Sequence, residues 1–297
     1  EREAAAAGEA GHGDHGGHRV GSFGWSSIQC TFAASGGHVD VLEWLVTEAG
    51  CPLIERTAAE AAKENRLDVL GWLESRRCPW DASVTAAAAA EGHLAALKFL
   101  REKGCPWDAS CCGRAAAGGH LEVLKWAREN GCEWDEATTR NAATFGQLEA
   151  LKWARKRKGA CPWDEEDVVS CAAAGGHVCI LRWAIEEEGC ACTDSTLCWK
   201  AARAGQLEAL QYLRERHGCP WDQLTTRFAA MKGHVACFEW AVSQGCAFDE
   251  RALEYASDLK HWGILEAARA ELHRGGRGVA EWFRTRRHWL RMQGLAQ

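Results

Sequence analysis

The chain has 297 residues, of which 47% are hydrophobic and 26% charged, a balance typical of a folded protein and not of a disordered one. No run approaches the roughly 18 uninterrupted apolar residues of a membrane-spanning helix, so we exclude a membrane span. Lys and Arg number 35 against 41 Asp and Glu, a net charge of −6, and this acidic balance gives no reason to expect a nucleic-acid partner.

Residues 1–24 form the first of three predicted parts, a flexible N-terminal segment or a decayed repeat. His12, His15 and His18 lie among glycines, which offer metal-ligand side chains little preorganisation. Two interpretations stay open for this stretch: a first repeat that has lost its pattern, and adventitious metal binding.

Residues 25–273 contain a repeat with a period of 27 to 30 residues. Its clearest mark is a Gly-His-Leu type of triplet, and nine copies fill this part of the chain. The middle positions of the nine copies are 38, 66, 93, 120, 147, 177, 206, 234 and 261.

The rare residues follow the same register. All five prolines come directly after a cysteine at one repeat position, and twelve of the sixteen tryptophans occupy two repeat positions, one in a loop and one in a helix. The cysteines of the loop position are Cys51, Cys78, Cys105, Cys132, Cys161, Cys190, Cys219 and Cys246.

One unit, from Asp108 to Asp135, shows the predicted elements. Asp108 is a good N-cap for a short Ala-rich helix over 109–117, which the following Gly-Gly ends. A second helix is expected over 121–129, with apolar residues on more than one face because it packs between neighbours. Strand patterns are absent, so we predict an all-α solenoid of about nine stacked helix-turn-helix repeats, in which the loop tryptophan acts as a wedge between units.

The segment Ala-Ala-Gly-Gly-His-Leu-Glu-Val-Leu at 116–124 and its counterparts resemble the ankyrin repeat. The resemblance covers roughly Trp25 to His273. The unit departs from the usual one because it is about six residues short, lacks Thr-Pro-Leu-His, and has a Gly-Cys-Pro-Trp-Asp type of loop in place of the β-turn finger. The array therefore resembles a finger-less ankyrin variant.

In ankyrin arrays the first helix of each unit lines the concave surface, so the resemblance implies a recognition strip there. The two positions before the paired alanines vary most between units, and the second half of the chain has bulky residues at them. Since aromatic and arginine side chains are common interface anchors, we expect a protein partner to bind this strip, unless the aromatics only fill gaps in local packing. The candidates are Arg140, Asn141, Trp199, Lys200, Arg227, Phe228, Glu254 and Tyr255.

The recurring Cys and His residues could suggest a ladder of metal sites, but the predicted helix places them at opposite ends. His120 and Cys132 should lie about 15–18 Å apart. Loop cysteines of successive units should be about 8–10 Å apart, beyond the ~7 Å Cα limit for a disulfide. We therefore expect structural cysteines without metal or disulfide, and histidines that hydrogen-bond the neighbouring turn.

Residues 274–297 are predicted to form a basic tail with an amphipathic helix. The tail has six Arg and one Glu, and Trp282, Arg286 and Trp289 are its candidate contact residues. It could cap the last repeat, dock on an acidic partner, or touch an anionic membrane or nucleic acid.

No catalytic motif is recognisable, so we predict a protein-binding scaffold that is not an enzyme and needs no cofactor. Its partner would be a protein or a multi-subunit complex. The alternatives are a metal- or redox-responsive protein that uses Cys and His, and an architectural subunit that makes contacts through its convex side. Reduced cysteines favour an intracellular location, cytoplasmic by default.

Overall fold

The computed structural model of the chain describes residues 26–156, 160–193, 195–273 and 284. Helices and short loops make up this part of the chain, and no strand occurs in it. The prediction of an all-α solenoid is confirmed.

The first helix of each unit, the A helix, begins after the loop that ends the preceding unit. The A helices are α1 (Ser27–Gly36), α3 (Glu55–Lys63), α5 (Ala82–Ala90), α7 (Ala109–Gly118), α9 (Glu136–Thr144), α11 (Glu165–Gly175), α13 (Thr196–Ala204), α15 (Gln223–Lys232) and α17 (Glu250–Asp258).

The second helix, the B helix, runs back antiparallel to the first. One B helix continues as a π-helical turn, η1 (Trp183–Glu187). The B helices are α2 (Val39–Thr47), α4 (Leu67–Ser75), α6 (Leu94–Glu102), α8 (Leu121–Glu129), α10 (Leu148–Lys156), α12 (Val178–Arg182), α14 (Leu207–His217), α16 (Val235–Ser243) and α18 (Trp262–His273).

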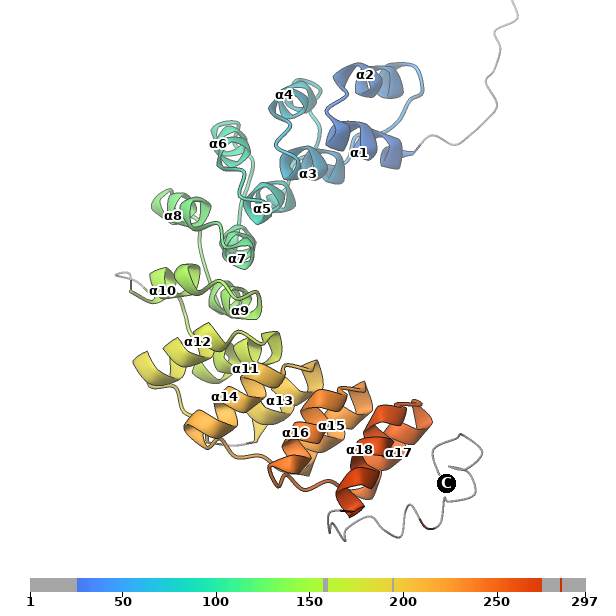
Figure 1. The fold of residues 1–297 in the computed structure, drawn as a ribbon. Coiled ribbons are helices and arrows are strands. Elements are labelled where there is room, and N and C mark those ends of the chain that lie inside the picture. Colours follow the sequence, from blue (N-terminus) through green and yellow to red (C-terminus); the bar gives the residue numbers. More distant parts are fainter. Residues whose placement is uncertain (1–25, 157–159, 194, 274–283, 285–297) are drawn as a thin grey trace, which may run out of the picture.

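The pairs stack in sequence order into an arc, with the A helices along its inner side (Figure 1). Successive A helices contact one another much more closely than successive B helices do. The paired alanines explain the difference, because residues such as Ala115 and Ala116 are buried between A helices and have no side chain long enough to hold them apart. Larger buried residues, such as Leu124 and Leu151, fill the B layer. The array therefore curves toward its A helices.

Asp residues at the end of the loops begin most A helices. The Asp108 carboxylate accepts a hydrogen bond of 2.9 Å from the backbone N–H of Ser110, and Asp81 and Asp222 cap α5 and α15 in the same way. Such caps satisfy N–H groups that a helix leaves without an intrahelical partner. The N-cap prediction at Asp108 is confirmed.

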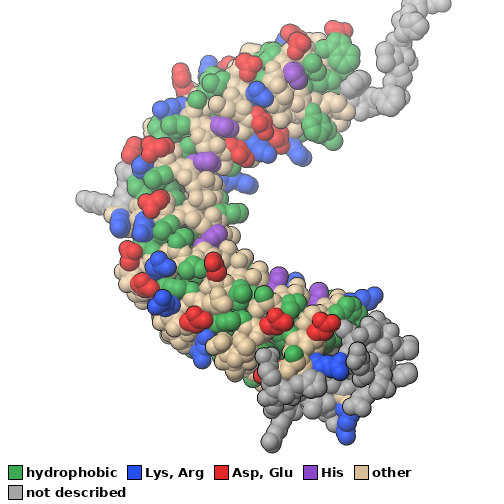
Figure 2. All heavy atoms as spheres, in the orientation of Figure 1, with side chains coloured by type: hydrophobic (Ala, Val, Ile, Leu, Met, Phe, Trp, Pro, Cys, Tyr) green, Lys and Arg blue, Asp and Glu red, His purple; other side chains and the backbone are tan. Residues whose placement is uncertain are grey.

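The repeat histidine links each unit to the one before it. Nε2 of His120 donates to the carbonyl of Ala90 at 2.9 Å, and Nε2 of His177 donates to Thr144 at 2.8 Å. Gln147 and Arg66 make the equivalent bond where histidine is replaced. Histidine side chains accordingly lie at intervals along the crescent (Figure 2). The prediction that these side chains hydrogen-bond the neighbouring turn is confirmed.

The glycine of each triplet leaves room for the His, Gln or Arg side chain that reaches back from the following unit. Gly119 has φ +73°, and a Cβ added to it would overlap the side-chain oxygen of Gln147 in the next unit. Gly131, at the end of α8, has φ +84° with open space around it. The two glycines thus share a left-handed backbone but differ in their surroundings.

We expect Gly131→Ala to lower the free energy of unfolding by about 1–2 kcal/mol, the cost of a left-handed alanine. Gly119→Ala should cost about 1 kcal/mol more, because the methyl group also displaces Gln147. Urea unfolding of both variants measures the two losses. Equal losses for the two variants would contradict a close contact between Gly119 and Gln147. Combining Gly119→Ala with Gln147→Ala should recover part of the extra loss of Gly119→Ala.

Tryptophans join successive units on the outer side of the arc. The loop residue Trp107 meets Trp126 of α8 edge to face, with ring centroids 5.9 Å apart, and the guanidinium carbon of Arg101 from α6 lies 4.1 Å from the Trp107 ring centroid. Three further loops repeat this arrangement. The prediction of an inter-unit wedge is confirmed, and the pairs are Trp134–Trp153, Trp163–Trp183 and Trp221–Trp240.

Candidate interaction surface

The inner face of the arc is hollowed near its middle. A cavity of about 610 Å³ lies over α7 and α9, and small residues form most of its wall. Arg114 and Phe145 line it as well, and the Phe145 side chain is 59% exposed. The lining residues are Ala90, Ala109, Ser110, Gly113, Arg114, Ala117, Gly118, Asp135, Ala137, Asn141 and Phe145.

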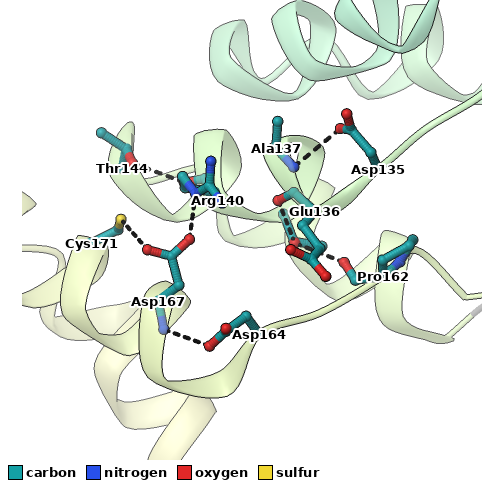
Figure 3. Close-up of polar contacts among 10 residues, drawn as sticks. Asp135, Glu136, Ala137, Arg140, Thr144, Pro162, Asp164, Asp167 and Cys171 are labelled. Carbon is teal, nitrogen blue, oxygen red and sulfur yellow. Dashed lines mark hydrogen bonds and ion pairs between the residues drawn. The ribbon is translucent and has the colours of Figure 1, made fainter.

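Two predicted strip residues bind neighbouring units. Arg140 from α9 forms an ion pair with Asp167 at the start of α11, and this carboxylate raises the pKa of the Arg140 guanidinium (Figure 3). Asn141 donates to the carbonyl of Gly113 in α7 at 3.2 Å. Both side chains therefore connect A helices, and Asn141 also lines the central hollow.

The predicted aromatic residues of units seven and eight stack on each other. The Trp199 and Phe228 rings have centroids 4.9 Å apart at an interplanar angle of 33°, and both side chains are half-buried. The Lys200 ammonium lies 5.8 Å from the Trp199 ring centroid. These contacts join α13 to α15 and fix the position of the aromatic pair.

The remaining described strip residues lie on α15 and α17. Arg227 forms an ion pair with Asp249 at the start of α17, and hydrogen bonding to that carboxylate raises the pKa of the guanidinium. Glu254 and Tyr255 are exposed on α17, Tyr255 at 40%. The tail candidates Trp282, Arg286 and Trp289 lie outside the described residues.

Three side chains of this face were not among the residues predicted from the sequence: Arg114, Phe145 and Arg203. Arg203 lies over Phe228, with its guanidinium carbon 5.9 Å from the ring centroid. Phe145 and Arg203 follow the paired alanines, whereas the predicted strip contains only residues from the two positions before them. Residues three or four positions apart share a helix face, so helical periodicity could have found them.

The loop cysteines hydrogen-bond the protein backbone. The Sγ atom of Cys132 donates to the carbonyl of Asp108 at 3.3 Å, and Cys105 and Cys161 bond the equivalent carbonyls of their units. All three are buried. Among the residues that the structure describes, no group of three or more His, Cys, Asp or Glu side chains could hold a metal ion.

We expect the thiols of Cys105 and Cys161 to be unreactive in the folded protein, because burial raises the pKa of both to about 12 and the thiolate is the reactive form. At pH 8 an alkylating reagent should label exposed Cys179 quickly, and Cys105 and Cys161 only after unfolding. Peptide mass spectrometry of the alkylated chain distinguishes the sites, and fast labelling of Cys105 would contradict the expectation.

The same pKa values predict a pH dependence of stability. Unfolded thiols lose their proton near pH 9 and the folded ones only near pH 12, so above pH 9 the unfolded state binds fewer protons. Stability should therefore be unaffected by these groups below about pH 8.5 and fall as the pH rises from 9 to 12.

One pair of cysteines corrects the expectation that successive units carry no disulfide. Cys192 and Cys219 are disulfide-bonded, with Cα atoms 5.4 Å apart. Cys219 occupies the usual loop position, but Cys192 stands where other units have the loop tryptophan. Because that position points toward the next unit, its side chain reaches the following loop, and the 8–10 Å spacing of equivalent positions does not apply.

None of the helices in the described part of the chain has the length and apolarity needed to cross a membrane. Comparison with known families matches residues 84–128 to ankyrin repeats (many copies). No curated protein was found to match the sequence significantly. The matched segment covers all of α6 and α7 and most of α5 and α8, whose loops, caps and inter-unit bonds recur along the array.

Proposed function

Because the chain contains ankyrin repeats, which generally mediate protein–protein interaction, we propose that it is a scaffold that binds a protein through its inner A-helix surface. The repeat array of residues 25–273 would supply the binding surface. The basic tail, residues 274–297, would be a second contact, with an acidic surface of the partner. In this proposal the chain has no catalytic role.

The observation that supports the proposal most is the central hollow of about 610 Å³. Ala, Gly and Ser at the inner positions of α7 and α9 leave backbone and small side chains open to a partner. Arg114 and Phe145 beside them are exposed and offer a charged and an aromatic contact. Such a combination of a shaped recess with arginine and aromatic anchors is typical of energetically important interface regions.

The residues of the predicted strip fall into two groups, those paired with neighbouring units and those with accessible surface. Arg140 and Arg227 are engaged with carboxylates of adjacent units, so their removal would weaken the array as well as any interface. Trp199 and Phe228 contact each other and leave part of their surface accessible. Exposed side chains in and beside the hollow are therefore better positions for a test than the inter-unit pairs.

The proposal can be tested by filling the central hollow with a bulky side chain. Ser110 is exposed in its wall, and Ser110→Trp should block a partner while the array stays folded. Ser75→Trp, at an exposed serine of the B helix α4, is the matched control on the outer side. Quantitative affinity capture with the full-length wild type and both variants compares the bound proteins, and thermal unfolding checks the fold.

We expect proteins that the wild type captures to be lost from Ser110→Trp and retained by Ser75→Trp. The reverse pattern would contradict the proposal and favour the architectural role of the outer, Trp-rich side. Equal capture by all three proteins would also contradict binding at the central hollow.

A further inference from the structure

A second recess lies on the inner face, two units away from the central hollow. It has a volume of about 330 Å³ between α11 and α13. Four of its six lining residues, Ser170, Cys171, Ala174 and Ala204, are small, and the other two are Lys200 and Arg203. The recess thus joins a largely apolar floor to two cationic side chains.

Lys200 and Arg203 differ from Arg140 and Arg227 on the same face. Arg140 and Arg227 have carboxylate partners in the next unit, whereas no carboxylate of the described residues pairs with Lys200 or Arg203. The carboxylate of Asp167 lies against Cys171 in the wall of the recess, but it forms its ion pair with Arg140. The positive charges of Lys200 and Arg203 are left for a group outside the array.

The neighbouring aromatic pair holds the cations in place. Lys200 lies 5.8 Å from the centroid of Trp199, and Arg203 lies 5.9 Å from that of Phe228. The two rings are themselves stacked at 4.9 Å. Contact with aromatic faces restricts long side chains before a ligand arrives, which lowers the entropy lost on binding.

The positive character continues into the next unit. Lys232, exposed at the end of α15, occupies the repeat position of Gly118, a lining residue of the central hollow, and so belongs to the same face. This local cluster of Lys200, Arg203 and Lys232 occurs in a protein of net charge −6. An anionic ligand would therefore be attracted to this section of the inner face in particular.

We propose that Lys200 and Arg203 bind an acidic peptide segment of the partner, with its carboxylates on the two cations and an adjacent apolar side chain in the 330 Å³ recess. This inference rests on the proposed function and specifies the chemistry of its partner. A peptide fits the recess better than a nucleic acid because the floor is largely apolar and small, and because only a short cationic cluster is present.

The test measures fluorescence anisotropy of labelled peptides with the full-length chain. The probe is an Asp/Glu-rich peptide with one central Leu, and its comparison is the same peptide with Asn and Gln in place of the acids. The inner-face variant combines Lys200→Glu with Arg203→Glu. The matched outer-face variant combines Lys98→Glu with Arg216→Glu, which reverses the charge of two exposed B-helix residues. A single-stranded RNA oligonucleotide competes for the site.

We expect the acidic peptide to bind the wild type and the outer-face variant alike, and the amide peptide to bind about tenfold more weakly or worse, the size expected for lost charge-assisted hydrogen bonds. The inner-face variant should lose a similar factor for the acidic peptide. Added salt should weaken binding of the acidic peptide only.

Equal affinity for the two peptides, unchanged binding by the inner-face variant, or no binding of the acidic peptide would each overturn this inference. RNA that displaces the peptide and binds more tightly would do the same. None of these outcomes would alter the capture experiment at Ser110, so failure of this inference is distinguishable from failure of the proposed function.

Discussion

Trp183→Ala should lower the free energy of unfolding by about 3–5 kcal/mol, the range for removing a fully buried tryptophan. Trp183 begins the π-helical turn η1 and is only 1% exposed, and Trp163 of the preceding loop meets it edge to face at 5.6 Å. The substitution removes this contact and leaves a cavity between two units. Urea unfolding of the full-length chain measures the loss.

Trp126→Ala is the matched control, because Trp126 has the same position in its B helix and the same type of loop partner. Its side chain is only half-buried, so we expect a smaller loss of about 1–2 kcal/mol. If both variants lost the same free energy, burial of Trp183 would not be the cause.

Reduction of the Cys192–Cys219 disulfide should have the next largest effect. The bond joins residues 27 positions apart, and closing a loop of that length stabilises a chain by about 3–4 kcal/mol in the chain-entropy treatment. A reductant should therefore lower the unfolding midpoint of the wild type by a corresponding amount.

Cys192→Ser provides the control for this experiment. It should have the lower midpoint from the start and should not respond to reductant, because the described cysteines other than Cys192 and Cys219 are free thiols. A wild-type midpoint that is unchanged by reductant would contradict a stabilising role of the disulfide. The result also tells whether a covalent link replaces the loop tryptophan that this unit lacks.

The helices were predictable because their signals are local. The Asp108 N-cap, the glycines after the A helices and the apolar pattern of 121–129 lie within or beside the elements that they define, and the structure has α7 and α8 at those positions. The number of units could be predicted equally well, because a period of 27 to 30 residues is visible in the sequence without knowledge of how the units pack.

The inner surface was predictable only in part. Periodicity identified variable positions such as Trp199 and Lys200, but it gave equal weight to Arg140, whose charge is paired with Asp167. It also passed over Arg203, because the positions after the paired alanines were not compared. The recess beside Lys200 and Arg203 is formed by the A helices of two adjacent units, so the pattern within a single unit does not predict it.

The helix pairs, their number and the loops between them follow from local sequence patterns, because each depends on residues a few positions apart. The stacking of the units sets which charges are paired, which cysteines are joined and where the inner face is hollow. Those properties depend on side chains about one repeat apart in the chain, such as Arg140 with Asp167 and Cys192 with Cys219, and only the stacking of units brings such residues into contact.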